Sequence, residues 1–109
     1  MTEPIRNDKQ NDINEIDRIV HEPARYLIMA YLHVVESSDF LFLKNQTGLT
    51  QGNLSSHLAK LETAGYVEIK KEFIGKRPHT MLNLTSKGRQ AFETYRSEMQ
   101  EILRNLPSG

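Results

Sequence analysis

Residues 49–65 read LTQGNLSSHLAKLETAG and contain the start, the buried face and the end of one helix. Thr50 is a residue type that caps a helix N-terminus, and Gly65 is the type that ends a helix in the left-handed conformation. The apolar residues between them recur at offsets of four and three, so they lie on one stripe. They are Leu54, Leu58 and Leu61. The stretch therefore predicts an amphipathic helix whose leucines pack inward.

The opposite face of this helix carries short and amide side chains. They belong to Gln51, Gly52, Asn53, Ser56, Ala59, Lys60 and Thr63. A DNA major groove admits a helix when the facing side chains are short or form hydrogen bonds with base edges. Amides pair with adenine and lysine pairs with guanine or phosphate, while Gly52 permits a close approach of the backbone. The same face suits a solvated surface helix equally well, so the helix alone leaves both interpretations open.

Two more helices precede this one in the predicted fold. Pro23 suits the first position of a helix, and residues 24–35 of this helix carry a wide apolar face that indicates a central core helix. A break separates it from a short helix over residues 40–47, which Asp39 caps and Gly48 ends. The residues expected to be buried in the short helix are Phe40, Leu41 and Leu43. The short helix, a tight turn and the helix after it form a helix-turn-helix.

An alternating pattern follows the Gly65 stop and predicts a two-stranded hairpin. Its alternating positions are Val67, Ile69, Phe73, Thr80, Leu82 and Leu84. The turn between the strands is Gly75-Lys76-Arg77-Pro78, so the tip is basic and rigidified by proline. Such a tip can contact phosphates or enter a minor groove, although an exposed, solubilising turn has the same composition. DNA binding is favoured because the tip and the helix face belong to one small unit.

Charge is unevenly distributed along a chain whose formal net charge is +0. Residues 1–22 hold three basic and six acidic residues, a net of −3, whereas residues 44–79 hold six basic and three acidic ones, a net of +3. The basic segment coincides with the candidate helix and hairpin, as expected for the side that faces a polyanion. The chain has 109 residues and no cysteine. One domain is expected, without disulfides, thiolate metal sites or a cysteine nucleophile.

The two ends of the chain are predicted to build a dimer interface. Residues 1–11 are expected to be a flexible tail, and residues 13–20 carry isoleucine and valine at helical offsets. A final helix begins at Thr85 or Ser86 and has apolar residues at spacings close to a heptad seam. One small domain has limited use for so long a helix, although packing onto its own domain is the alternative. The predicted interface residues are Ile13, Ile16, Val20, Phe92, Tyr95, Met99, Ile102 and Leu106.

The sequence does not support a metal site, a catalytic site or a membrane-spanning segment. The histidines lie on different predicted elements without metal-ligand spacing, so we expect no metal and no cofactor. His57 is expected to pack against the hairpin, and His33 to form a surface pair with Glu36. No catalytic set of side chains can be assembled, so an enzyme is not expected. The longest apolar run, residues 27–32, falls short of the roughly 20 residues that cross a bilayer, and we expect a soluble, cytoplasmic protein.

Several motifs occur together between Pro23 and Tyr95. They are residues 49–58 (LTQGNLSSHL), Lys60-Leu61-Glu62, residues 64–67 (AGYV), Lys71, Gly75-Lys76-Arg77-Pro78, Thr80 and residues 84–89 (LTSKGR). In combination they resemble the motifs of small winged-helix transcriptional regulators related to the MarR and ArsR families. The resemblance implies a homodimer that binds a pseudo-palindromic operator, with the helix after Thr50 in the major groove and the basic turn at its flank.

The positions to which the resemblance assigns DNA contacts lie on the helix and the turn. They are Thr50, Gln51, Gly52, Asn53, Ser55, Ser56, His57, Lys60, Lys76 and Arg77. The chain lacks the cysteine ligands of ArsR-type metal sensors and is shorter than typical MarR-type regulators. Thiolate metal sensing and the MarR-type ligand pocket are therefore not carried over.

These patterns predict a mainly α protein with a small β-hairpin, an α+β winged helix-turn-helix with extra N- and C-terminal helices in one domain, residues 12–109. Its expected function is that of a homodimeric regulator that binds double-stranded DNA in a sequence-specific manner. The alternative is a winged-helix module that binds another protein, which the neutral net charge leaves open.

Overall fold

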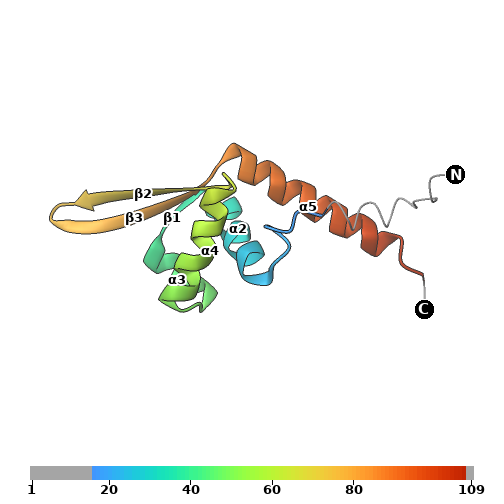
Figure 1. Cartoon of the computed structure of the whole chain (residues 1–109), viewed down its shortest axis with the longest axis horizontal. Helices are drawn as coiled ribbons and strands as arrows, with labels where there is room; N and C mark the ends of the chain where they lie inside the picture. Colours follow the sequence, from blue (N-terminus) through green and yellow to red (C-terminus); the bar gives the residue numbers. More distant parts are fainter. Residues whose placement is uncertain (1–15, 108–109) are drawn as a thin grey trace, which may run out of the picture.

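Four helices and a three-stranded antiparallel sheet make up residues 16–107, which the computed structural model of the chain describes. The elements are α2 (Pro23–Val35), β1 (Ser37–Asp39), α3 (Phe40–Thr47), α4 (Gln51–Thr63), β2 (Val67–Ile74), β3 (Arg77–Leu84) and α5 (Ser86–Arg104). The hairpin β2–β3 projects from one end of the molecule and α5 from the other (Figure 1). The predicted α+β fold class and its order of helix-turn-helix and hairpin are confirmed.

The leucine stripe of α4 lies at the centre of the core. Leu54 and Leu61 are fully buried and Leu58 is 2% exposed. They pack in one cluster with residues of the other elements: Ile28, Met29 and Leu32 of α2, Leu43 of α3, Val67 of β2, Leu82 and Leu84 of β3, and Phe92 of α5. The stripe predicted from spacing alone therefore joins α4 to every other helix and to the base of the hairpin.

The helix starts follow the predicted capping residues. The Thr50 hydroxyl accepts a hydrogen bond from the Asn53 amide, and the Asp39 carboxylate accepts one from the Phe42 amide. Each cap satisfies an amide that the first helical turn leaves without a backbone partner. The α2 helix begins at Pro23 as predicted, with Glu22 as its cap. These bonds within the chain's own neighbourhood define where the helices begin.

Strand pairing in the hairpin separates its side chains into two faces. A two-residue loop, Gly75-Lys76, connects the strands, and Gly75 has φ +64°, which glycine adopts without strain. Directly paired residues lie on the same face, and successive residues alternate between faces. The pairs on one face are Val67–Leu84, Ile69–Leu82, Lys71–Thr80 and Phe73–Pro78. The pairs on the other face are Glu68–Asn83, Lys70–Met81, Glu72–His79 and Ile74–Arg77.

The structure corrects four local predictions. The predicted break before Asp39 contains β1, which pairs with residues 81–83 of β3; three polar residues carry no strand pattern. Leu41 is 61% exposed because α3 turns this side outward. Residues 16–20 form a bend and turns instead of a helix. His33 pairs with Glu93 of α5 at 3.2 Å, not with Glu36. The predicted tail and Ile13 lie outside the described residues.

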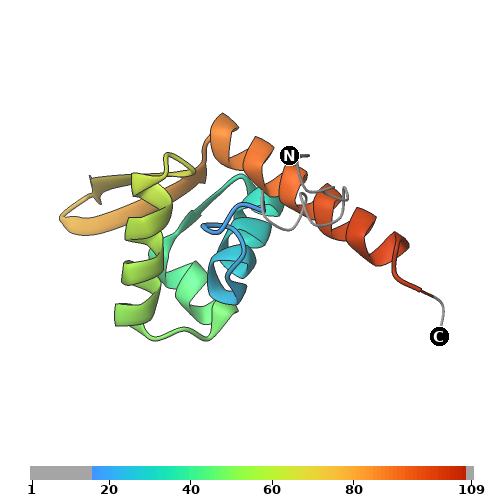
Figure 2. The same cartoon turned by 45° about the vertical axis from the view of Figure 1, so that its right-hand side comes forward.

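Gly88 of α5 meets the backbone of Tyr66, which links the end of α4 to β2. A Cβ built on Gly88 would lie 2.1 Å from the Tyr66 carbonyl oxygen, so only glycine fits here. The Thr85 amide donates to the Tyr66 carbonyl at 3.0 Å, and the Thr85 hydroxyl donates to the Gly65 carbonyl at 2.6 Å. Figure 2 shows the end of α4, the base of the hairpin and the start of α5 together. We call this contact the Tyr66–Gly88 crossing.

The Tyr66 side chain also attaches the segment before α2 to this crossing. Its hydroxyl donates a short hydrogen bond to the Asp17 carboxylate, whose other oxygen accepts from the Ile19 amide at 2.8 Å. Burial first, and then Asp17 through its hydrogen bond and charge, raise the pKa of Tyr66 to about 12. The ammonium group of Lys87 lies 5.7 Å from the centre of the Tyr66 ring. Tyr66 thus contacts two other segments: the start of α5 through its backbone and its ring, and the segment before α2 through its hydroxyl.

We expect Gly88→Ala to destabilise the protein by about 1–3 kcal/mol, because the added methyl group forces two backbones apart. Gly52→Ala is the matched control, since Gly52 also lies in the first turn of a helix but a Cβ there meets nothing within 4 Å. This control should be neutral or stabilising by up to about 1 kcal/mol. Urea unfolding of both variants measures the difference, and equal stabilities would contradict the crossing as a constraint.

Candidate nucleic-acid interface

The outer side of α4 is exposed over its whole length. The predicted contact residues found there are Gln51, Gly52, Asn53, Ser55, Ser56 and Lys60. All of their side chains except that of Lys60 are short or end in an amide, so they leave room for a nucleic-acid groove. Thr50 is exposed as well, although its hydroxyl already accepts the capping bond from Asn53. The structure therefore brings these seven predicted residues together on one helix and its cap.

A groove separates one flank of α4 from one face of the hairpin. Its α4 wall includes Gln51 and Ser55, and its hairpin wall includes Lys71 and Thr80. These two hairpin residues form one of the paired positions identified above, so the groove side of the hairpin is the face that also carries Phe73 and Pro78. This groove thus runs between the two elements that the sequence predicted to contact DNA. Its lining also contains apolar residues and Glu62 of α4, so Lys71 is the basic residue among those that line it.

Lys71, which the sequence analysis named among the family-like motifs but not among the assigned DNA contacts, lies in this groove. The sequence contains a signal for it, because alternation along a strand places Lys71 on the same side as Ile69, whose apolar side chain faces the protein. The neighbouring Lys70 lies on the opposite face and forms an ion pair with Glu68 at 3.8 Å. The two adjacent lysines therefore have different environments.

Lys76 and Arg77 occupy the exposed tip of the hairpin, as predicted. Lys76 belongs to the two-residue loop and Arg77 begins β3 opposite Ile74. Arg77 therefore starts from the face of the hairpin that points away from the groove. Beyond the three residues that pair with β1, the hairpin has only two strands, so the tip stands free of the core (Figure 1).

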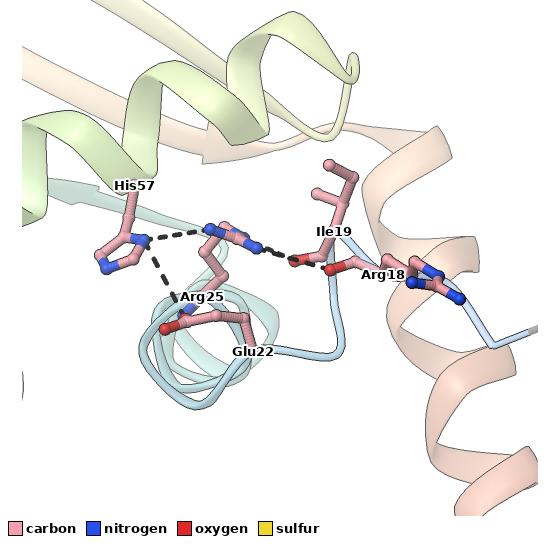
Figure 3. A network of polar contacts seen from close by, with 5 residues as sticks. All are labelled: Arg18, Ile19, Glu22, Arg25 and His57. Atoms are coloured by element: carbon pink, nitrogen blue, oxygen red, sulfur yellow. Dashed lines mark hydrogen bonds and ion pairs between the residues drawn. The ribbon is translucent and has the colours of Figure 1, made fainter.

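His57 lies on a different side of α4 from the one predicted. Instead of packing against the hairpin, its ring points toward α2, where Nδ1 accepts a hydrogen bond from Nη1 of Arg25 at 3.3 Å (Figure 3). Arg25 is only 9% exposed, and its Nε donates to the Ile19 carbonyl at 2.7 Å. Its Nη2 donates to the Arg18 carbonyl at 3.4 Å. Because arginine only donates, a neutral His57 must carry its proton on Nε2.

The predicted dimer residues divide into buried and accessible ones. Ile16 is 9% exposed, Val20 is fully buried and Phe92 is 5% exposed, so in this structure they complete the protomer's own core. Tyr95 is half-buried and its hydroxyl forms a hydrogen bond with His21 at 2.8 Å. The accessible part of the seam is the end of α5. It consists of the half-buried Met99 and Ile102 and the exposed Leu106.

A second apolar surface lies on the outside of α2. Leu27 is 38% exposed and Val34 is 79% exposed, and with Ala30 and Tyr31 they line a shallow hollow. A helix on a protein surface normally carries charged residues on its outer side. The one Asp, Glu, Lys or Arg in α2 is Arg25, which is buried. This surface thus resembles a helix face that another protein surface covers.

Two further features concern residues 16–107 only. Within this range, histidine, aspartate and glutamate side chains form no group of three that could hold a metal ion. None of the helices in the same range has the length and apolar composition needed to span a membrane.

Comparison with known proteins gives one family match and one close relative. The family described as winged helix DNA-binding domain matches residues 24–103. The chain is 40% identical over 89 residues to the uncharacterized protein MJ0432 of Methanocaldococcus jannaschii, which covers 82% of this chain and 97% of that protein. The family match includes α2 through nearly the end of α5.

Solved structures share the fold. A transcriptional regulator homologue from Pyrococcus horikoshii superposes with a TM-score of 0.83 at 29% identity, covering 90% of this chain and 99% of that one. A mutant MarR from E. coli complexed with operator DNA gives a TM-score of 0.63 at 22% identity, covering 92% of this chain and 75% of that one. At this lower identity the likeness concerns the fold.

We expect Arg25→Met to destabilise the protein by about 1–3 kcal/mol, because two partly buried carbonyl groups and His57 lose their donor. Arg18→Met is the control: its side chain is exposed and only its backbone carbonyl takes part in the network, so its effect should stay within about 0.5 kcal/mol. A double-mutant cycle with His57→Ala, measured by urea unfolding, should show coupling between Arg25 and His57. Strict additivity would contradict the proposed link between α2 and α4.

Proposed function

Because this chain belongs to the family of winged helix DNA-binding domains, we propose that it is a transcriptional regulator that binds a specific sequence of double-stranded DNA. One observation carries the proposal: the exposed, short-chained side of α4 and the hairpin face that carries Lys71 border the same groove. The regulator homologue from Pyrococcus horikoshii and the operator complex of a MarR mutant, which have the same fold, support it.

The α4 helix is proposed to enter the major groove with its N-terminal half. Gln51 and Asn53 offer amides that can pair with adenine, and Ser55 and Ser56 offer hydroxyls that adapt to several bases. Gly52 presents bare backbone on this side and has open space around it. Base edges can therefore approach the first turn of α4 more closely than a larger side chain would allow.

The hairpin is proposed to position the duplex by contacting its backbone and the flanking minor groove. With α4 in the major groove, the phosphate strand between the two grooves would follow the channel that Lys71 and Thr80 border. Lys76 and Arg77 at the tip would contact phosphates or sugars farther along. Such contacts give affinity and orientation, whereas the α4 contacts give sequence preference.

A homodimer on a pseudo-palindromic operator is proposed from the two uncovered apolar surfaces. The α5 helix has 19 residues and is about 28 Å long, yet its buried residues, Gly88 and Phe92, are confined to its first half. Its second half presents Met99, Ile102 and Leu106, while α2 presents Leu27 and Val34. A two-fold axis would let each copy cover the other and would space half-sites by about one helical turn or a multiple of it.

Binding of another protein in place of DNA is the competing proposal. The neutral net charge is compatible with it. A random-sequence duplex pool tests the choice: selection should recover related sequences with two-fold symmetry, and binding should weaken steeply with added salt. Failure to bind any duplex at low salt would contradict the DNA-binding proposal.

Lys71→Gln should weaken binding to the selected duplex and reduce the slope of log affinity against log salt by about 1, because one phosphate contact is lost. Lys70→Gln is the matched control, since this exposed lysine is adjacent in sequence but lies on the other face beside Glu68. Fluorescence anisotropy across a salt series measures both slopes. Equal losses from the two variants would refute the proposed orientation of the hairpin.

Replacing Met99 and Ile102 together by lysine should convert a dimer to a monomer, because four charges would be placed in one two-fold interface. Gln100→Lys, at an exposed position between them, is the control and should remain dimeric. Sedimentation equilibrium gives the mass, and circular dichroism checks that the helices are retained. A double variant that stays dimeric would show that the interface lies elsewhere.

A further inference from the structure

Two large apolar side chains are exposed at the tip of the hairpin. Phe73 is 72% exposed and Ile74 is 59% exposed, and they directly precede the Gly75-Lys76 loop. Neither side chain belongs to the core cluster or packs against it. The core thus gives no reason for an aromatic and a branched aliphatic residue at these positions.

The strand register assigns the two residues to different faces. Phe73 is paired with Pro78 and lies on the face that also carries Lys71 and Thr80, which border the groove beside α4. Ile74 is paired with Arg77 on the opposite face. On the groove side, the tip therefore ends in an apolar pair, Phe73 and Pro78, with a lysine one pair closer to the core.

Charge around the apolar pair indicates the kind of surface that it meets. Lys71 lies one pair closer to the core on the same face, and the exposed Lys76 and Arg77 lie at the adjoining loop, with Arg77 on the opposite face. The groove-facing pairs beyond Ile69 contain no acidic residue. A minor groove matches this arrangement, because its floor consists of base edges and sugars while anionic phosphates line both sides. A neutral or basic protein surface would leave these cations without counter-charges.

We infer that Phe73, backed by Pro78, is a wedge that enters the DNA minor groove, loosens the stacking of a base step and bends the duplex. This inference rests on the proposed function and adds a residue that sequence patterning assigned only to the hairpin's alternation. Apolar wedges of this kind bend duplexes by about 20–90° toward the major groove. The fixed φ of Pro78 limits the motion of the strand directly opposite Phe73.

The wedge also implies specificity at positions that no side chain of α4 touches. Base steps differ in how easily they unstack, and pyrimidine–purine steps such as TA yield most readily. We therefore expect such a step in the selected duplex at the site that the hairpin tip covers. Its replacement by a stiffer step should weaken binding even though the α4 contacts are unchanged.

The test compares Phe73→Ser with Ile74→Ser on the duplex that the wild-type protein selects from a random-sequence pool. Both changes remove an exposed apolar side chain from the same tip, so they should affect folding alike. A 2-aminopurine base at the step under the tip reports unstacking by an increase in fluorescence, and energy transfer between end labels reports bending. Phe73→Leu serves as the conservative variant, because leucine also acts as a wedge.

Phe73→Ser should lower the affinity about tenfold and remove both the fluorescence increase and the bend, because the wedge loses its apolar surface. Ile74→Ser should retain both readouts, and Phe73→Leu should restore them in part. If the wild type binds the duplex but the two serine variants behave alike, the inference that Phe73 is a wedge is contradicted. The proposal that the protein binds DNA is then unaffected. If the wild type binds no duplex, both fail.

Self-association provides the remaining outcome. If Phe73→Ser leaves affinity, fluorescence and bending unchanged but lowers the molecular mass measured by sedimentation, then the tip contacts a second copy of the chain. That result would also overturn the wedge.

Discussion

The close approach of two backbones at the Tyr66–Gly88 crossing constrains the rest of the structure. The missing side chain at Gly88 lets the first turn of α5 touch Tyr66, and Thr85 hydrogen-bonds to both Gly65 and Tyr66. The short segment of Gly65 and Tyr66 follows α4, leads into β2 and lies against the residue that follows β3. Because each of these elements leaves the crossing in a fixed direction, their relative orientation is set at one point.

This constraint has a consequence for the proposed regulator. Three elements meet at the crossing. They are α4, which is proposed to enter the major groove, the hairpin, which is proposed to contact the minor groove, and α5, which is proposed to bind a second copy. A change in the packing of α5 would therefore be transmitted to α4 and to the hairpin without an intervening flexible linker. The Arg25–His57 contact adds a second connection, between α2 and the side of α4 that faces away from the hairpin.

The spacing of apolar residues and the helix-capping residues explain how much of the fold could be predicted. The leucine stripe, the Thr50 cap and the Gly65 stop predict α4 because helix spacing and terminal hydrogen bonds are local properties. The hairpin was predicted by alternation in the same way. Strand β1 was missed because Ser37–Asp39 is too short and polar to show a period, and it forms only by pairing with β3. Likewise, Val20 and Phe92 looked available for a dimer because apolar spacing does not reveal which surface covers a residue.

The sequence by itself determined where the helices α2 to α5 and the hairpin form, which side of α4 is apolar and where the hairpin turns, since neighbouring residues carry that information. Only the tertiary structure decided that His57 faces Arg25, that the hairpin face with Lys71 borders a groove beside α4, and that Gly88 admits Tyr66. These contacts join residues on different elements that are distant in the chain, so tertiary packing determines them.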